Sequence, residues 1–173
     1  MGRKGNARYV IPSEDEWYKA AYYDPNKPGG AGYWDYPTGT DSVPSNDLVN
    51  PDPGNNANFY QDGYTIGSPY YRTVVGEFEN SESPYGTFDQ GGNVTEWNEA
   101  VLFETTRGIR GGAWDMPFSD GYVLRSIDRG SYEPEHEGNS PGFRVAEVPE
   151  PATMSLLALG GLGILIKQQH LGR

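Results

Sequence analysis

One long stretch of turn-forming residues limits what this chain can fold into. Residues 26–56 have the sequence NKPGGAGYWDYPTGTDSVPSNDLVNPDPGNN, in which Gly, Pro, Asn and Asp recur too often for a helix or strand to continue. The same stretch holds Tyr33, Trp34 and Tyr36, and such large rings gain stability when they are buried. We therefore expect an ordered, irregular loop. Disorder of residues 27–56 is the alternative.

The rest of the chain has the same character. Its 173 residues include 24 Gly, 14 Pro, 13 Tyr and 4 Trp, so the apolar material comes as rings spread through loops. The length fits one domain with a core. A net charge of −11 excludes nucleic acid as the main partner, because phosphate binding needs clustered Lys and Arg. With no cysteine, disulfides, thiol nucleophiles and thiolate metal sites are excluded as well.

A helix is predicted directly after Pro12, in the sequence SEDEWYKAAYY. Ser13 is the expected N-cap, and Glu16, three residues later, completes a capping box. The helix should end near residues 24–26 and bury one face, made of Trp17, Ala20 and Ala21. Short strands are predicted at residues 72–78, 106–110 and 142–146. The fold class is therefore α+β, with most of the chain in ordered loops.

Ordered loops of this length need a stabilising contact, since fixing each backbone residue costs about 1–2 kcal/mol. Calcium would provide it, because this ion takes six to eight oxygens from carboxylates and turn carbonyls. The stretch GTFDQGGNVTEW offers the side chains of Asp89 and Glu96 with the carbonyls of Gly92 and Val94. A second candidate set combines the side chains of Asn58 and Asp62 with the carbonyls of Phe59 and Tyr64. In the alternative interpretation, Asp89 and Asn93 cap turns and Glu96 pairs with an arginine.

The C-terminus differs in kind from the rest of the chain. Val148, Pro149, Glu150 and Pro151 precede an apolar run from Met154 to Ile166 and a basic end. This order resembles the PEP-CTERM sorting tail of exported bacterial proteins, so residues 148–173 are predicted to form a separate tail with a short hydrophobic helix. The resemblance implies a membrane-inserted intermediate, removal of the tail by an exosortase, and delivery to the cell surface or extracellular matrix. A short buried core helix is the alternative.

Residues 1–147 resemble the sulfatase-modifying factor family, the formylglycine-generating enzymes and their relatives. The resemblance rests on four blocks in order: IPSEDEWYKAAYY, YGTFDQGGNVTEW, IRGGAWD and RGSYEPEHEGNSPGFRVA. It implies an irregular, C-type-lectin-like α+β domain with two calcium ions. Carried over by position, the ligands are the two sets already given: Asn58, Phe59, Asp62 and Tyr64; Asp89, Gly92, Val94 and Glu96. Because family domains have a longer N-terminal part and export requires a signal peptide, we expect the chain to be N-terminally truncated.

The catalytic residues of that family are not expected here. Its oxidase holds copper with two cysteines, and their places fall on Gly121 and Ser126, neither of which is a thiolate ligand. A related iron-dependent branch uses three histidines, whereas this chain has only His136 and His170. The sequence therefore predicts neither copper nor iron. The alternative is an oxidoreductase of this family that acts on protein cysteine, with catalytic residues supplied from outside this chain.

A non-catalytic, calcium-stabilised binding domain is thus the predicted function. The expected ligand is a surface protein or a glycan, and the expected ligand face is residues 119–140 with Arg125 and Arg129. Chelation is expected to lower the melting temperature, because it removes a ligand that binds only the folded form.

Overall fold

The computed structural model of this chain describes residue 4 and residues 6–116 and 119–148. The chain divides into two compact units. The larger unit, residues 11–144, contains the helix, the main sheet and the long loops. The smaller unit joins residues up to 10 with residues from 145 onward. In it, β1 (Tyr9–Val10) pairs with β8 (Ala146–Glu147) in antiparallel register, and Arg8 forms an exposed ion pair with Glu147 at 2.9 Å. The predicted C-terminal helix lies outside the described residues.

Helix α1 spans Glu14–Tyr22 and begins as the sequence predicts. The Ser13 hydroxyl accepts a hydrogen bond from the Glu16 backbone N–H, and the Glu16 carboxylate accepts one from the Ser13 backbone N–H, so the capping box is complete. The helix ends at Tyr22, a little before the predicted end near residues 24–26. Its buried face also differs: Ala20 is only half-buried, and Tyr22 is buried beside Trp17 and Ala21. The Tyr22 ring packs edge-on against Trp17, and its hydroxyl donates to the carbonyl of Leu124 at 3.1 Å.

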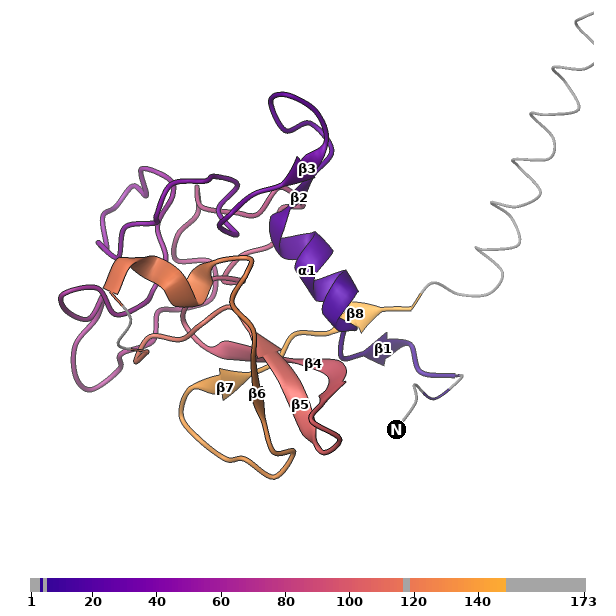
Figure 1. The fold of residues 1–173 in the computed structure, drawn as a ribbon. Helices are drawn as coiled ribbons and strands as arrows, with labels where there is room; N and C mark the ends of the chain where they lie inside the picture. Colours follow the sequence, from indigo (N-terminus) through magenta and orange to yellow (C-terminus); the bar gives the residue numbers. More distant parts are fainter. Residues whose placement is uncertain (1–3, 5, 117–118, 149–173) are drawn as a thin grey trace, which may run out of the picture. The chain divides into compact units, whose positions relative to one another are not determined.

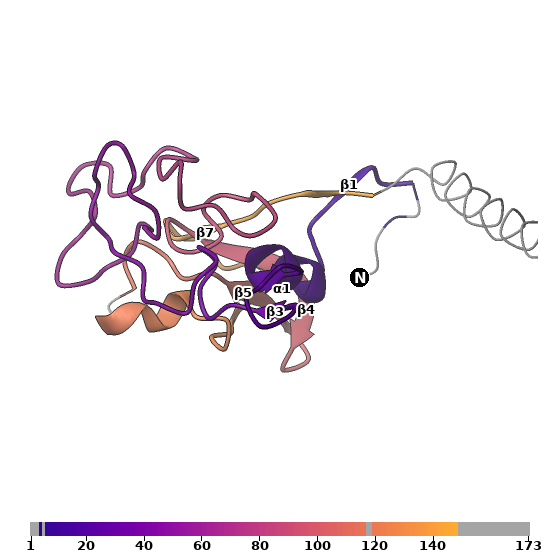
Figure 2. The same cartoon turned by 90° about the horizontal axis from the view of Figure 1, so that it is seen from above.

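Loops make up most of the larger unit. After the short hairpin of β2 (Tyr23–Asp24) and β3 (Gly32–Tyr33), the chain runs through residues 34–94, all of them described, without forming a named strand. Isolated bridges tie these loops together at Tyr36–Thr40, Ser45–Asn56 and Asn58–Gly92. Figures 1 and 2 show the loops gathered at the end of the larger unit where η1 lies. Apart from the two residues of β3, residues 26–56 therefore form the irregular loop that the sequence predicts.

The strand predicted at residues 72–78 does not form. Gly76 has a φ of +75°, which turns the backbone, and the amide of Glu77 donates to the carbonyl of Val74. Val74 and Val75 are 70% and 87% exposed, so neither contacts a sheet or a core. Two neighbouring β-branched residues predict a strand by propensity alone, but here no partner strand or apolar surface covers them.

The main sheet has the order β6-β5-β4-β7. The strand β5 (Thr106–Arg110) has the predicted bounds and pairs antiparallel with β4 (Thr95–Leu102) and with β6 (Gly130–Tyr132). β7 (Pro141–Gly142) pairs parallel with β4. The predicted strand at 142–146 is thus divided between β7 and β8. Neither β4, the longest strand among the described residues, nor η1 (Ser119–Leu124), a 3-10 helix, was predicted from the sequence.

The core is small and unusually polar. One apolar cluster contains Tyr36, Ala57, Phe59, Val123 and Leu124; the other contains Trp17, Ala21 and Tyr22. Among the described residues, buried polar side chains are as numerous as buried apolar ones. Buried polar groups cost free energy unless they are hydrogen-bonded. The pairing of these polar groups therefore decides whether the loops are held in place.

Candidate functional site

The two positions predicted to correspond to the family's cysteines, Gly121 and Ser126, lie in and just after η1. Gly121 has a φ of +66°, and a Cβ placed on it would stand 2.9 Å from a methyl carbon of Val43. A side chain at this position would therefore be strained and would collide with its neighbour. Ser126 is buried; its backbone N–H donates to the carbonyl of Asp35 at 2.8 Å, and its own carbonyl accepts from Arg110 at 3.0 Å. Gly121 thus has no room for a side chain, and the backbone of Ser126 links two other segments.

Glu96 lies in β4 and forms the centre of a buried polar cluster. Its side chain is 7% exposed and takes a two-point hydrogen bond from the guanidinium of Arg144, with Nη2 donating to Oε1 at 2.7 Å and Nε donating to Oε2. The indole N–H of Trp17 in α1 also donates to Oε2, at 2.6 Å. Arg144 reaches the carbonyl of Phe88 as well, at 3.1 Å. The cluster therefore joins the helix, the sheet and the loop before β4.

A second ion-pair cluster lies around Glu14 in the first turn of α1. Arg110 from β5 and Arg129 both bind the Glu14 carboxylate; the contact from Arg110 is 2.7 Å. The side chains of Arg110 and Glu14 are only 10% and 14% exposed. Arg110 also donates to the carbonyls of Ser126 and Asp128. The segment after η1 is thereby held to the helix.

The arginines of the predicted ligand face are both paired with acids. Arg129 binds Glu14, and Arg125 binds Asp35 at 3.0 Å. Both arginine side chains remain partly exposed, at 43% and 35%. A ligand that used these guanidinium groups would first have to displace, or share, their carboxylate partners.

In the predicted calcium set of Asp89, Gly92, Val94 and Glu96, one carboxylate already has a charged partner, the guanidinium of Arg144. A metal ion at Glu96 would have to share the carboxylate with the guanidinium of Arg144. The two positive charges, bound to the same carboxylate, would repel each other. Asp89 instead accepts a hydrogen bond from the amide of Gly76 at 2.7 Å. The pairing of Glu96 with an arginine, which was the alternative interpretation, is therefore present, and calcium binding at this set stays a prediction.

The predicted set of Asn58, Phe59, Asp62 and Tyr64 offers a single carboxylate, that of Asp62, which is exposed. The carbonyl of Phe59 accepts from the side-chain amide of Asn46 at 3.2 Å. The side-chain amide of Asn58 donates to the carbonyl of Tyr71 and to the Asn93 side chain, while Tyr64 contributes an exposed ring. Within the part of the chain that the structure describes, no three His, Asp or Glu side chains gather in a way that could hold a metal ion. Calcium at these sets stays a prediction.

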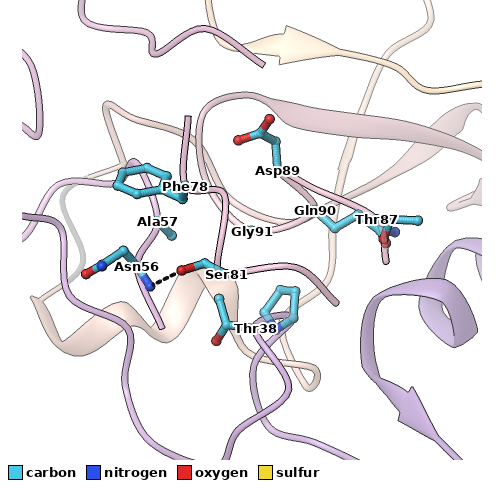
Figure 3. A pocket seen from close by; sticks show the side chains of 10 residues that line it. Thr38, Asn56, Ala57, Phe78, Ser81, Thr87, Asp89, Gln90 and Gly91 are labelled. Atoms are coloured by element: carbon cyan, nitrogen blue, oxygen red, sulfur yellow. Dashed lines mark hydrogen bonds between the residues drawn. The ribbon is translucent and has the colours of Figure 1, made fainter. Parts of the chain in front are cut away.

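Asp89 lies at the rim of a small polar hollow (Figure 3). Burial raises the pKa of Asp89, although the hydrogen bond from Gly76 and the charge of Arg144 act against that rise. Asn56 and Ser81 line the other side of the hollow and are hydrogen-bonded to each other at 2.9 Å. His136 is not among the residues that line the hollow; its ring is stacked on that of Tyr132, with ring centroids 4.2 Å apart. Asp89 is therefore the lone carboxylate among the lining residues, and the hollow is built mainly from hydrogen-bonded loop residues.

A buried carboxylate that the sequence analysis did not single out holds two loops together. The side chain of Asp52, 3% exposed, accepts hydrogen bonds from the Asn56 amide at 2.6 Å, the Ser81 hydroxyl at 2.8 Å and the backbone N–H groups of Gly54 and Asn80. Burial acts to raise its pKa, but these four donors outweigh burial and lower the pKa below its usual value. The motif Asp-Pro-Gly-Asn signals a turn, yet nothing in it points to partners at residues 80 and 81.

Comparison with known protein families and structures gives two family matches. The model described as the sulfatase-modifying factor enzyme 1-like domain matches residues 2–148. The model described as the PEP-CTERM protein-sorting motif matches residues 147–168. Both resemblances predicted from the sequence are therefore confirmed, while the domain boundary after residue 147 stays a prediction. The sorting motif indicates a protein that is exported, recognised by exosortase-type machinery and processed at the membrane.

Several solved structures share the fold. Treponema denticola variable protein 1 is 22% identical, with a TM-score of 0.53 over 82% of this chain and 48% of that one. CarF is 21% identical, with a TM-score of 0.53 over 85% and 50%. PvdO from Pseudomonas aeruginosa is 24% identical, with a TM-score of 0.53 over 82% and 53%. The chain thus spans about half the length of each. No curated protein matches it.

The membrane segment predicted in the tail, together with Pro149, Glu150 and Pro151, lies outside the described residues. Within the described residues, no helix has the length and apolar character needed to cross a membrane.

Proposed function

Because the chain belongs to the family of sulfatase-modifying factor enzyme 1-like domains and carries a PEP-CTERM sorting motif, we propose that it is a non-catalytic binding domain that acts at the cell surface or in the extracellular matrix. The family supplies the fold, and the sorting motif supplies the route out of the cell. The fold is one in which long loops, held on a small sheet and helix, present side chains to the outside.

The environment of Gly121 is the observation on which this proposal depends. The place predicted for a catalytic cysteine is a glycine in a left-handed conformation, where an added Cβ would stand 2.9 Å from Val43 and 3.6–3.7 Å from Tyr36 and Phe59. The second predicted place, Ser126, has its backbone committed to Asp35 and Arg110. With no cysteine in the chain, the thiolate chemistry of the family has no residue to carry it.

In this proposal, calcium is not needed to hold the loops in place. Arg144 already balances the charge of Glu96, and Asp52 is already satisfied by four hydrogen-bond donors. We therefore propose that calcium taken up at either predicted set adds to a frame that the buried ion pairs and hydrogen bonds hold by themselves. The polar cluster of Glu96, Arg144 and Trp17 then has the organising role that the sequence assigns to a metal ion.

Two assays on the full chain test the proposed function. In the first, the chain is incubated in air with a peptide that carries a sulfatase-type cysteine, with and without added copper, and the peptide is followed by mass spectrometry. We expect the cysteine to remain unchanged. In the second, the chain is applied to an array of matrix polysaccharides and surface proteins from PEP-CTERM-producing bacteria, and we expect retention on the array.

The control in the first assay is the same peptide with serine in place of cysteine, which reports background modification. Copper-dependent conversion of the cysteine to an aldehyde would overturn the non-catalytic assignment. The control in the second assay is the chain unfolded in urea, which should lose retention. An array that retains none of the folded chain would contradict a binding function.

A further inference from the structure

Four tyrosines on the loop of residues 59–73 make up what we call the tyrosine surface. The rings of Tyr60, Tyr64 and Tyr71 are joined through Tyr64, and Tyr70 is the exposed neighbour of Tyr71 in the sequence. Tyr64 packs edge-on against Tyr60 and Tyr71, each at a centroid distance of 5.0 Å. Tyr71 is stacked on Trp114 at 4.7 Å. Trp114 is 8% exposed, whereas Tyr64 and Tyr70 are 48% and 73% exposed. The surface therefore has a buried aromatic base and exposed rings above it.

Side-chain amides of three asparagines hold the backbone that carries these rings. Asn46 donates to three carbonyls of the loop, those of Phe59, Gln61 and Gly63, at 3.0–3.2 Å. Asn58 donates to the carbonyl of Tyr71 at 3.0 Å, and Asn93 donates to that of Thr73 at 3.3 Å. Asn58 and Asn93 are themselves buried. The exposed rings are thus positioned before any ligand arrives, which lowers the entropy lost on binding.

The charge of this loop differs from that of the whole chain. Residues 59–73 contain one acid, Asp62, and one base, Arg72, so their formal charge is zero, whereas the chain carries −11. Exposed aromatic residues with few charges are typical of binding surfaces. The acidic remainder of the chain would repel an anionic polymer. The surface therefore fits an uncharged ligand.

We propose that the tyrosine surface binds a neutral glycan. A pyranose ring has C–H groups on its faces and hydroxyls around its rim. Each tyrosine offers a flat apolar ring face with a phenolic hydroxyl at its edge, so one side chain contacts the sugar face and hydrogen-bonds the rim. Asp62 and Gln61, on the same loop, add carboxylate and amide groups that can bond sugar hydroxyls. This inference rests on the proposed binding function and names the ligand class and the surface.

Affinity electrophoresis of the full chain through gels that contain a neutral β-glucan, a neutral galactomannan or the anionic polymer hyaluronan tests the proposal. The wild-type chain should be retarded by at least one neutral polymer and not by hyaluronan. Tyr70→Ala and Tyr64→Ala should each weaken that binding by about tenfold. Tyr33→Ala is the matched control, because Tyr33 has the same exposure as Tyr64, 48%, but lies in β3. It should bind like the wild type.

Circular dichroism melts of each variant separate lost binding from lost folding, and Tyr70→Ala, which removes the more exposed ring, should melt like the wild type. Unchanged retardation of both tyrosine variants would overturn the proposal while leaving the binding function in place, as would retardation by hyaluronan alone. Loss of a protein partner from the array in these variants, with no glycan retained, would overturn it in favour of a protein ligand. A chain retained by no polymer and by no array component would overturn this proposal and the binding function together.

Discussion

Replacing Arg144 with methionine should lower the free energy of unfolding by about 3–5 kcal/mol, because it leaves the buried carboxylate of Glu96 without its charged partner. The Glu96 side chain is 7% exposed, and among the described residues only the indole N–H of Trp17 still donates to its carboxylate after the substitution. Methionine preserves much of the apolar stem of arginine, so the loss reports mainly the charge and its hydrogen bonds. Urea denaturation at pH 7 measures the effect.

The matched control is Arg8→Met, which removes an arginine from an exposed ion pair with Glu147, where the side chains are 64% and 57% exposed. Exposed pairs contribute about 0–1 kcal/mol, so this variant should unfold almost like the wild type. The double variant Glu96→Gln/Arg144→Met should lose less free energy of unfolding than the sum of the losses in the two single variants. Each single variant leaves one charged group unpaired, whereas the double variant leaves none. If Arg144→Met cost no more than Arg8→Met, the buried pair would have no organising role.

Replacing Asp52 with alanine should cost about 3–4 kcal/mol, measured in the same urea titration. The substitution leaves four donors without their acceptor, among them the buried side chains of Asn56 and Ser81. Asp47→Ala is the control: Asp47 is exposed and accepts from the Ser45 hydroxyl. It should change stability by less than about 0.5 kcal/mol. Equal effects of the two substitutions would show that Asp52 does not hold the loops together.

The pKa of Asp52 adds a pH signature to this prediction. Because the folded-state pKa lies below the ordinary value of about 3.9, the ionised carboxylate stabilises the folded form above that value. This contribution is lost as the pH falls through the lower folded-state pKa. The stability difference between the wild type and Asp52→Asn should therefore be largest near neutral pH and shrink below about pH 4. A constant difference down to pH 3 would argue against this assignment.

Features with short-range signals were predictable from the sequence. The capping box of α1 involves two residues three apart, and β5 ends directly before the glycine pair at residues 111 and 112, so local rules place both. The family and the sorting motif followed from blocks of residues in a fixed order. The loop over residues 26–56 followed from turn chemistry alone.

Features that depend on distant partners were not predictable. β4 was missed because its sequence, TEWNEAVL, lacks the apolar alternation of a half-buried strand. Glu96 is buried in it because Arg144, 48 residues away, and Trp17, 79 residues away, satisfy the carboxylate. No local pattern specifies those partners. The same holds for Asp52, whose donors at residues 80 and 81 lie in another loop.

The predicted strand at 72–78 failed for the opposite reason. Its local propensity was right, but Val74 and Val75 found no surface to cover. The residues of the predicted calcium sets have suitable oxygen atoms. In the structure, the oxygens of Glu96 are paired with the guanidinium of Arg144. Ligand chemistry read from a sequence does not include the competing cation that the fold brings to the same carboxylate.

Thermal unfolding of the full chain with and without an excess of chelator, beside Arg144→Met, tests most directly whether buried polar pairs hold the loops. Arg144→Met should lower the melting temperature by roughly 6–20 °C, whereas chelator should shift that of the wild type by clearly less. If the wild type in chelator had a melting temperature as low as that of Arg144→Met without chelator, a bound metal ion would instead hold the loops.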